Sequence, residues 1–472
     1  MTKESLLFCA SECYPFAKTG GLADIAHSFP QALQERYTPT VVLPLYSCIN
    51  QQKYNIQPLE KTFSISMDGV EYLAELYGCT YEKIEYIFVY VDILSQKEFL
   101  YGTLSGDYQD NALRFALFSR VIVEILRNNT YSIAHLNDWQ TALVPLLLED
   151  EPLIDTKTLF TIHNLAYQGI FSYETLQSIG VDSKYFTSDI LEFYGQINFM
   201  KGAIKYSDAI TTVSQNYAKE IVTEKYGCGL EGFLECHKYK LTGIMNGIDS
   251  EHFSPLHDTL IEYPFQTLTE KKQNKKKYLK EKKLTKLTDP LFIFIGRFTE
   301  QKGLDLLIES LDFIATQKCN IAILGEGSSE YQEKLQKKAD QSPNIYCDFT
   351  YNEKLSHEMY AACDFLVMPS LFEPCGLNQM ITMSYGAIPI VHSVGGLKDS
   401  VHNYKKFDKL SSDGYGIVFD TFSLNAFKNA LQQALALYAT KREYNKIVKY
   451  NMLCDFSWKK SVQSYSKLYQ EL

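Results

Sequence analysis

Basic residues follow predicted strands at points where an open α/β sheet would bind ligands. Arg297 and Lys302 come shortly after the apolar run Leu291–Ile295, and ligands bind such sheets at the carboxyl ends of strands. Arginine offers a rigid fork of donors and lysine a compact charge, so the pair could stabilise two oxygens of a departing diphosphate. Lys18, beside Gly20, is a further candidate phosphate ligand, although a solvated surface lysine explains it equally well.

Paired glycines occur twice in a similar setting. Gly20-Gly21-Leu22-Ala23-Asp24 lies in the first half of the chain and Gly395-Gly396-Leu397-Lys398-Asp399 in the second. Each pair precedes a predicted helix, where glycine lets backbone N–H groups approach a ligand and the helix N-terminus favours an anion. Ordinary turns of a doubly wound protein would look the same. The two copies favour one anionic ligand shared by two domains.

An acidic residue stands at the strand-to-helix turn in the segment 369–379. Glu373 comes just before the expected helix, with Pro374 next to it, so its side chain should project from a fixed turn. The N–H groups of Cys375–Leu377 would then open the helix. Alternatively, Glu373 only balances the dipole of that helix.

Two polar residues follow strands of the first half. His163 ends the apolar run that begins at Leu159, and Asp138 follows the run Ile133–His135. Both should lie at the edge of the sheet where ligands bind. A carboxylate at position 138 suits hydrogen bonding to hydroxyl groups, but it could equally cap the helix that follows. A lone histidine is more often structural.

The scaffold for these residues is a series of short apolar strands that alternate with longer helix-like stretches. Repeated βα units predict parallel sheets with helices on both faces. One sheet with so many strands would be unusually large, so two α/β domains are expected. The expected strands are 6–10, 40–43, 86–91, 133–135, 159–163, 209–213, 291–295, 321–324, 345–348, 365–368 and 388–392. The expected helices are 110–128, 139–148, 214–224, 304–315, 330–339, 355–362 and 377–385.

The break between the halves falls near residues 246–290, where the Asn246-Gly247 turn signal opens a polar stretch. The predicted domains are residues 1–245 and 246–454, with a C-terminal segment, 455–472, after them. A lysine-dense run from Lys271 to Lys286 leaves room for a nucleic-acid patch. The glutamates within it favour a solvated helix face.

Composition excludes several classes of protein. The 472 residues carry 46 basic and 56 acidic side chains, a net charge of −10, which argues against general affinity for nucleic acid or anionic lipid. No apolar run approaches the ~20 residues of a membrane helix, and no export signal precedes the first strand. The 11 cysteines contain no C-x-x-C pair, so we expect no zinc site and a reducing cytoplasm as the location.

These segments together resemble those of bacterial glycogen synthases and plastid starch synthases, over about residues 5–470. The Lys18–Asp24 and Phe372–Leu377 segments are the most specific. Further matching segments are Asp110-Asn111, Arg114-Phe115, His135–Gln140, His163–Gly169, Asn246–Asp249, Arg297, Glu300–Gly303 and Asp455–Trp458. The resemblance implies the α/β GT-B fold, with two Rossmann-like domains whose parallel sheets face a deep interdomain cleft. It also implies that a C-terminal helix, 455–472, packs back on the first domain. It also implies retaining transfer of glucose from a nucleotide sugar, usually ADP-glucose, to the non-reducing 4-OH of an α-1,4-glucan.

The resemblance assigns roles to single residues. Glu373 and His163 would contact the transferring glucose, while Arg297 and Lys302 would hold the diphosphate; these four are the candidate catalytic residues. The candidate substrate-binding residues are Lys18, Gly20, Gly21, Asp24, Tyr101, Asp138, Asn164, Asn246, Tyr351, Cys375, Gly376, Leu377, Gly395 and Gly396. Tyr351 could stack on the nucleotide base or simply cover the core at a strand end. No metal or other cofactor is expected, because fixed cations supply the positive charge that the diphosphate needs.

The chain departs from the family pattern on the expected phosphate side. Val394 stands where threonine is common, and Ser384 and His392 stand where arginines are common. These substitutions bear on donor affinity, so UDP-glucose is retained as an alternative donor. A non-catalytic glucan-binding homologue is the alternative from another class, although a pure binder has no need of both diphosphate cations. Same-face and double displacement both remain open.

Overall fold

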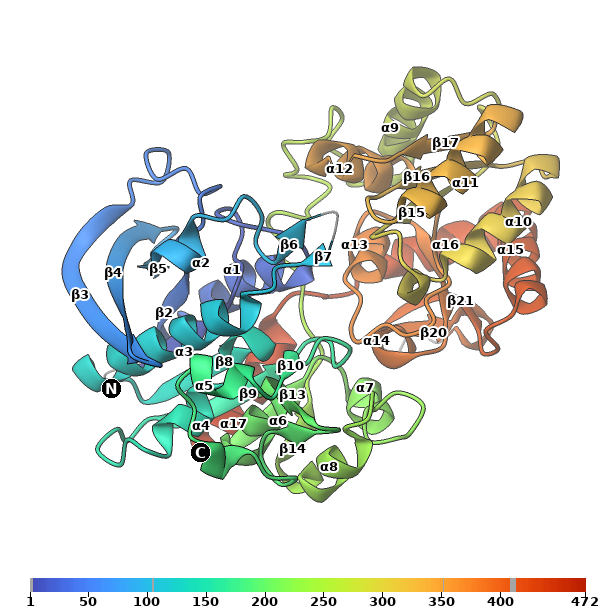
Figure 1. Cartoon of the computed structure of the whole chain (residues 1–472). Coiled ribbons are helices and arrows are strands. Elements are labelled where there is room, and N and C mark those ends of the chain that lie inside the picture. Colours follow the sequence, from blue (N-terminus) through green and yellow to red (C-terminus); the bar gives the residue numbers. More distant parts are fainter. Residues whose placement is uncertain (1–2, 104–105, 351, 408–412) are drawn as a thin grey trace. The chain divides into compact units, whose positions relative to one another are not determined.

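The computed structural model describes residues 3–103, 106–350, 352–407 and 413–472 (Figure 1). The chain forms two compact units. The first comprises Met1–Val213, Ala218–Asn246 and Trp458–Leu472, and the second comprises Ser214–Tyr217 and Gly247–Ser457. The chain therefore passes from one unit to the other at residue 246 and returns at residue 458, beside the boundaries 245/246 and 454/455 that the sequence predicts.

The first unit contains a nine-stranded sheet in the order β14-β13-β9-β8-β1-β2-β5-β4-β3. Its seven parallel strands run from β14 to β5, and the winding reverses between β1 and β8, which is the doubly wound Rossmann pattern. The strands are β1 (Glu4–Cys9), β2 (Tyr37–Pro44), β3 (Gln57–Met67), β4 (Val70–Tyr81), β5 (Ile84–Tyr90), β8 (Ile133–Asn137), β9 (Lys157–Ile162), β13 (Ala209–Thr212) and β14 (Leu241–Gly243).

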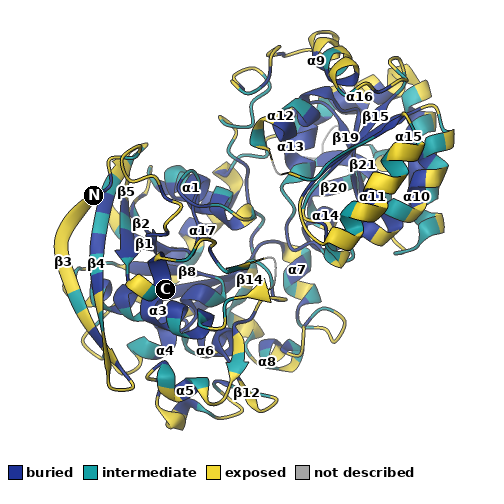
Figure 2. Ribbon diagram, turned by 45° about the horizontal axis from the view of Figure 1, so that its top comes forward, coloured by how far each residue is buried: buried dark blue, intermediate teal, exposed yellow. Residues whose placement is uncertain are grey.

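The antiparallel strands β3 and β4 extend this sheet and were not predicted. Neither has the continuous apolar run of a buried parallel strand, and Figure 2 shows β3 exposed along most of its length. In β4 the burial alternates, so only one face is covered. The turn between them is Asp68-Gly69, with φ of 50° and 74°. An Asp-Gly pair is a hairpin signal, so the sequence did carry a sign of this turn.

Helices cover the first sheet and close its core. They are α1 (Gly21–Leu33), α2 (Asp92–Ser95), α3 (Asn111–Asn128), α4 (Val144–Leu148), α5 (Thr175–Ser178), α6 (Phe199–Tyr206), α8 (Glu231–Cys236) and α17 (Lys459–Glu471). A three-stranded sheet of β10 (Ile170–Ser172), β12 (Gln196–Asn198) and β11 (Glu192–Phe193) and the pair β6 (Gly102–Thr103) and β7 (Gly106–Asp107) complete the unit. The C-terminal segment packs against α1, where Trp458 Nε1 donates to Ser28 Oγ at 2.8 Å.

Two predicted helices differ from those observed. The stretch 139–148 is divided into a 3-10 turn, Trp139–Thr141, and α4, because Pro145 lies in the first turn of α4 and has no N–H to continue a helix from before it. The helix predicted over 214–224 is α7 (Gln215–Glu220), which straddles the two units.

The second unit has a seven-stranded, wholly parallel sheet in the order β17-β16-β15-β18-β19-β21-β20. Its winding reverses between β15 and β18. The strands are β15 (Leu291–Ile295), β16 (Asn320–Leu324), β17 (Ile345–Asp348), β18 (Phe365–Met368), β19 (Ile388–His392), β20 (Val401–Asn403) and β21 (Gly414–Phe419). The helices are α9 (Leu268–Glu281), α10 (Leu304–Thr316), α11 (Ser329–Gln341), α12 (Glu353–Ala362), α13 (Asn378–Ser384), α14 (Gly395–Ser400), α15 (Leu424–Ala439) and α16 (Lys441–Asn451).

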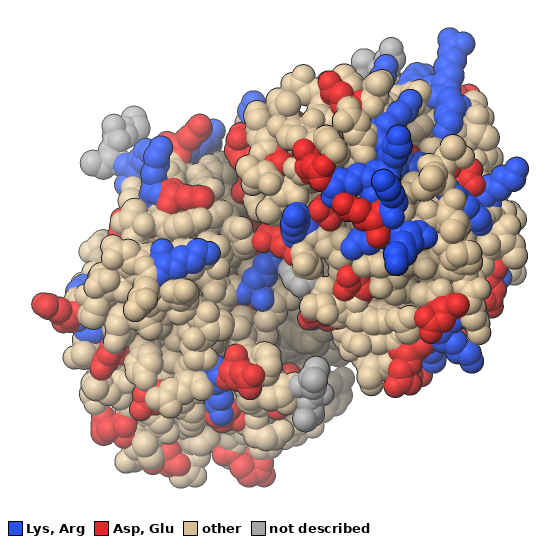
Figure 3. Space-filling view, turned by 90° about the horizontal axis from the view of Figure 1, so that it is seen from above, with Lys and Arg blue, Asp and Glu red and all other residues tan. Residues whose placement is uncertain are grey.

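The lysine-dense run forms α9, which begins at a Thr267–Glu270 capping box. Lys275 pairs with Asp364 at 2.5 Å and Lys277 with Glu281 at 2.9 Å. Figure 3 views the molecule from the side on which α9 lies and shows basic and acidic side chains interspersed. The sequence favoured a solvated helix face; the exposed part of α9 fits that expectation, but Lys271 is buried. Within the described residues, no helix is long and apolar enough to cross a membrane.

Candidate active site

In the first unit, the candidate residues follow the carboxyl ends of β1, β8 and β9, around the point where the winding reverses. Lys18 lies in the loop after β1, and its Nζ contacts Asp24 Oδ1 in the first turn of α1 at 2.6 Å. Each of the two side chains is 25% exposed. Asp24 therefore neutralises part of the Lys18 charge, which the sequence offered either to a phosphate or to solvent. Gly20 precedes α1 in an extended conformation, and Gly21 begins the helix.

A buried carboxylate that the sequence analysis missed supports this loop. Glu12 is 3% exposed and accepts hydrogen bonds from Thr19 N at 2.6 Å and Thr19 Oγ1 at 2.7 Å. Burial raises the pKa of Glu12, against the lowering effect of these hydrogen bonds. Glu12 thus holds the backbone beside Lys18 in place. Its signal in the sequence was an acid three residues after the end of a buried strand.

Two other predicted residues in this unit have specific surroundings. The hydroxyl of Tyr101 lies 2.7 Å from Ser11 Oγ, at the end of β1. Asn246 is the last residue of the unit before the crossing; it is 3% exposed, and its buried Nδ2 has no hydrogen-bond partner in the described parts of the chain. An unsatisfied buried amide is costly unless something else satisfies it, so Asn246 is suited to receive a polar ligand.

Asp138 does not cap the short helix that follows it. Its backbone adopts φ of 56°, and its Oδ1 accepts from the backbone N of His163 at 2.8 Å. Burial raises the pKa of Asp138 to about 7, against the lowering effect of hydrogen bonds from the backbone of His163 and Asn164. Asp138 therefore joins the ends of β8 and β9. Asn164 in turn accepts from Ala166 N at 3.1 Å and so shapes the loop.

His163 is held as a neutral imidazole. Asn137 Nδ2 donates to Cys9 O at 2.9 Å, which leaves Asn137 Oδ1 as the acceptor of a hydrogen bond from His163 Nε2 at 2.8 Å. Burial lowers the pKa of His163 to about 3. Its buried Nδ1 has no hydrogen-bond partner within the described structure. That nitrogen is therefore an acceptor, of the kind that a sugar hydroxyl can satisfy.

Asp138→Asn is expected to change how stability depends on pH. Because burial raises the pKa of Asp138 to about 7 from an unfolded value of about 3.9, the wild-type side chain favours the folded state most below the unfolded pKa. That contribution is lost as the pH rises through about 7. The difference in melting temperature between wild type and variant should thus shift in favour of the variant from pH 5 to pH 8. Asp155→Asn, at an exposed position, is the control; an equal shift there would contradict the assignment.

In the second unit, the partly exposed Lys302 forms an ion pair with the buried Glu373. Lys302 Nζ lies 2.9 Å from Glu373 Oε1 and 2.7 Å from Oε2, and Ser370 Oγ donates to Oε2 at 3.0 Å. Glu373 is 5% exposed. Lys302 follows β15 and Glu373 follows β18, the two strands where the winding reverses. Arg297 is exposed just after β15. The structure thus brings together Lys302 and Glu373, which are 71 residues apart in the sequence.

Backbone contacts from several segments fix the turn that carries Glu373. Leu371 N donates to Gln301 O at 2.9 Å, and the His392 ring Nδ1 donates to Ser370 O at 2.7 Å. Ser214 Oγ, which the second unit includes, donates to Pro374 O at 2.7 Å. Glu373 is therefore held rigidly, as a group that must act at a defined position should be.

The second glycine pair supports this turn, which corrects the expectation that the Gly396 amide faces a ligand. Gly396 N donates to Glu373 O at 3.0 Å and to Pro374 O at 3.1 Å. A Cβ on Gly395, whose φ is 44°, would lie 1.9 Å from Glu373 O. Glycine is required because the two backbones touch, and the Gly396 N–H is already used.

The start of the next helix also differs from the prediction. Helix α13 begins at Asn378 with Leu377 as its N-cap, so the amides of Cys375–Leu377 precede the helix. Gly376 has φ of 70°, and its carbonyl accepts from Gln379 Nε2 at 2.9 Å. The left-handed glycine ends the turn and delays the helix by one residue from the predicted start at 377.

The remaining predicted positions lie in the second half of the chain. Tyr351 lies outside the described residues. Val394 is the N-cap of α14, and Ser384 Oγ donates to Met380 O within α13 at 3.1 Å. His392 is buried and stacks on Phe419 with ring centroids 5.3 Å apart. His392 thus supports the Glu373 turn from β19.

Comparison with known proteins defines the class of this protein. Residues 5–236 match the family described as starch synthase catalytic domain, and residues 275–451 match glycosyl transferases group 1. The sucrose-phosphate synthase of Thermosynechococcus elongatus has the same fold, with a TM-score of 0.63 at 15% identity over 99% of both chains. The fold is GT-B, as the sequence predicted, and the protein is a glycosyltransferase.

Full-length relatives identify the family. The glycogen synthase of Geotalea daltonii is 40% identical over 98% of each chain, and that of Aquifex aeolicus is 39% identical over 99% of each chain. The catalytic domain of starch synthase IV from Arabidopsis thaliana, bound to ADP and acarbose, matches with a TM-score of 0.93 and 31% identity, over 100% of this chain and 99% of that chain. The chain belongs to the family of glycogen and starch synthases, which confirms the resemblance seen in the sequence.

Proposed function

We propose that this glycogen synthase transfers glucose, with retention of configuration, from ADP-glucose to the non-reducing 4-OH of an α-1,4-glucan. The observation that carries the proposal is the Lys302–Glu373 pair after β15 and β18, at 2.7 Å. Positive charge is needed where the diphosphate departs, and a carboxylate is useful where positive character develops at the anomeric carbon. The pair supplies both, and the exposed Arg297 adds a second cation for the diphosphate.

The surroundings of Glu373 favour same-face displacement over a covalent intermediate. Both of its oxygens accept from Lys302, and Oε2 also accepts from Ser370. Three accepted hydrogen bonds and the neighbouring Lys302 charge lower the nucleophilicity of this carboxylate. It is better suited to position the glucose. The acceptor hydroxyl then attacks as the diphosphate leaves, and a donor phosphate oxygen takes its proton.

The first unit supplies groups for the sugar. His163 Nδ1 is an acceptor without a protein partner in the described chain, so it can receive a hydrogen bond from a glucose hydroxyl. Asp138 keeps the backbone of His163 in register through the 2.8 Å hydrogen bond to its N–H. We assign Asp138 a positioning role, and His163 a direct one.

We predict that transfer needs no divalent metal. Lys302 and Arg297 provide the fixed cations that a metal–diphosphate complex would otherwise provide, and no Asp-x-Asp motif stands at a strand end of the candidate site. Treatment of the protein with a chelator, followed by removal of the chelator, should leave the rate of glucose transfer unchanged within twofold. Complete loss of transfer, restored by magnesium or manganese, would contradict this prediction.

Parallel assays with radiolabelled ADP-glucose and UDP-glucose on glycogen test the proposed donor. We expect kcat/KM to favour ADP-glucose. A tenfold preference for UDP-glucose would overturn the donor assignment and leave the glycosyltransferase assignment intact. Absence of transfer from either donor, with glycogen binding preserved, would favour the non-catalytic alternative.

We also propose the cytoplasm as the location. None of the 11 cysteines, which all lie in the described residues, forms a disulfide, and Cys48, Cys228 and Cys236 are exposed. Exposed thiols are typical of a reducing compartment.

A further inference from the structure

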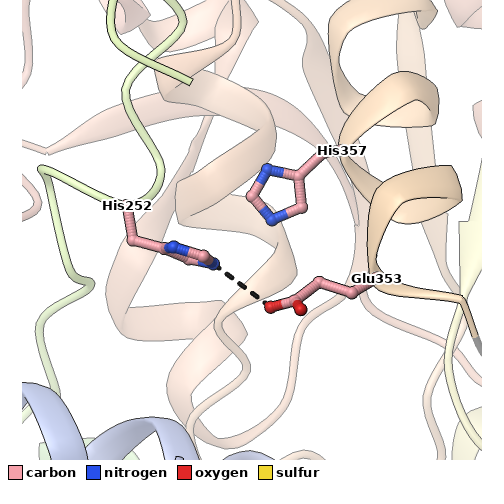
Figure 4. A group of neighbouring side chains, drawn as sticks. All are labelled: His252, Glu353 and His357. Atoms are coloured by element: carbon pink, nitrogen blue, oxygen red, sulfur yellow. Dashed lines mark ion pairs between the residues drawn. The ribbon is translucent and has the colours of Figure 1, made fainter. Parts of the chain in front are cut away.

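Two histidines and a glutamate converge in the second unit, on elements that carry none of the candidate catalytic residues. Figure 4 shows His252, Glu353 and His357, with the side chains directed toward one another. His252 Nε2 lies 3.3 Å from Glu353 Oε1, and one ligand atom from each of the three residues lies within 4.8 Å of the others. His252 belongs to the loop after Gly247, and the other two lie in α12.

His357 is fixed in the orientation that a metal ligand needs. It is 1% exposed, its Nδ1 lies 2.8 Å from Asp258 Oδ2, and its ring stacks on Phe253 with centroids 5.0 Å apart at 20°. Asp258 also accepts from Tyr385 OH at 2.6 Å, so its position is fixed as well. Nδ1 faces the Asp258 carboxylate, so Nε2 is the ring nitrogen left for a metal ion, and it points toward His252 and Glu353 in Figure 4. A carboxylate behind a histidine in this way is typical of metal sites.

The other two ligands are positioned by local hydrogen bonds. Glu353 and His357 are four residues apart on one helix and so share a face. The Asn352 side chain accepts from Leu355 N at 3.0 Å and caps the turn that carries Glu353. In the loop, Asp249 Oδ1 accepts from His252 N at 3.0 Å and so holds the backbone of His252.

The geometry points to a zinc site formed by His252, Glu353 and His357, with water as the fourth ligand. Zinc bonds of ~2.0–2.1 Å in a tetrahedron place ligand atoms about 3.3 Å apart, which His252 and Glu353 already satisfy. The side chains of His252 and Glu353 are 29% and 35% exposed, so they have room to rotate. Rotation can shorten the distances of up to 4.8 Å between the three ligand atoms to the tetrahedral value. Calcium and magnesium are less suited, since they prefer all-oxygen ligand sets.

The bound ion joins two segments of the second unit. It connects the loop directly after the crossing at Gly247 to helix α12, so it stabilises the folded state without taking part in glucose transfer. The chain lacks paired cysteines, which is why the sequence predicted no zinc site. Here the ligands are imidazoles and a carboxylate, and no local spacing brings residue 252 to residue 353.

The test uses the full-length protein, stripped with a chelator, desalted, and titrated with zinc chloride. Calorimetry should show one saturable site in the wild type, with affinity at least tenfold weaker in Glu353→Gln and the site lost in His252→Ala. Zinc should raise the melting temperature of the wild type by more than that of either variant. His257→Ala, an exposed histidine of the same loop, is the matched control and should bind zinc as the wild type does.

The variants change partly exposed side chains, so each is expected to keep the metal-free melting temperature of the wild type. Cobalt in place of zinc gives a second readout, because thiolate ligation would add a charge-transfer band that an imidazole–carboxylate site lacks. Absence of saturable zinc binding, unchanged binding in His252→Ala, or a thiolate band that persists in it would each overturn the proposal. None of these results bears on the donor assays above.

Discussion

Glu373→Ala should lower the turnover number by about 10²–10³-fold, because loss of one group that acts in the transition state typically costs that much. The wild-type carboxylate is 5% exposed and held by Lys302 and Ser370, so it acts from a fixed position. The KM for the donor should change far less than kcat, because the contact strengthens as charge develops. Initial rates of glucose transfer onto glycogen at saturating donor measure the effect.

Two further variants separate charge from packing. Glu373→Gln keeps the shape of the side chain, so the variant should remain folded. It removes the counter-charge of Lys302, so its turnover number should be nearly as low as that of Glu373→Ala. Glu300→Ala removes an exposed acid two residues before Lys302 and should transfer at the wild-type rate. A folded Glu373→Ala enzyme within twofold of wild-type turnover would show that Glu373 does not act in the transition state.

Gly395→Ala is expected to disrupt the same site through the backbone. A Cβ at this position would lie 1.9 Å from the carbonyl oxygen of Glu373, so the turn must move. A displacement of about 1 Å at a positioned group can cost 10²-fold in rate, and a non-glycine residue in the left-handed region adds roughly 1–2 kcal/mol. We therefore expect at least a 10²-fold loss of kcat/KM together with a lower melting temperature.

Gly69→Ala is the matched control for backbone strain alone. Gly69 also has positive φ, at 74°, but a Cβ there would meet nothing within 4 Å. This variant should lose a small amount of stability and keep full activity. Equal activity losses in the two variants would mean that contact between Gly395 and Glu373 is not what fixes the turn.

The sequence by itself determined the alternating architecture and the places where the site would form. Parallel strands buried on both faces need continuous apolar runs, and runs such as Leu291–Ile295 and Phe365–Met368 are visible without any structure. His163 directly follows such a run, and Glu373 lies in the loop after one, so both must lie on the side of the strand ends, since that follows from strand direction alone. The sequence motifs also identified the family.

Strand β3 escaped prediction because its exposure leaves no apolar run. The start of α13 was misjudged because Gly376 extends the turn, and its left-handed backbone is seen only in the folded chain. These are local errors, in which a weak pattern or a permissive residue left more than one conformation open.

Only the tertiary structure decided which residues meet and in what chemical state. Lys302 and Glu373 were expected to bind different parts of the donor, yet they contact each other because β15 and β18 are neighbours in the sheet. The Gly395–Gly396 pair supports Glu373 instead of presenting both amides to a phosphate. His163 is a neutral acceptor because Asn137, on the adjacent strand, accepts the hydrogen bond from Nε2–H, which leaves Nδ1 with its lone pair. Each outcome depends on a contact between segments far apart in the chain, and hydrogen-bond partners, burial and close backbone approach exist only once those segments have packed together.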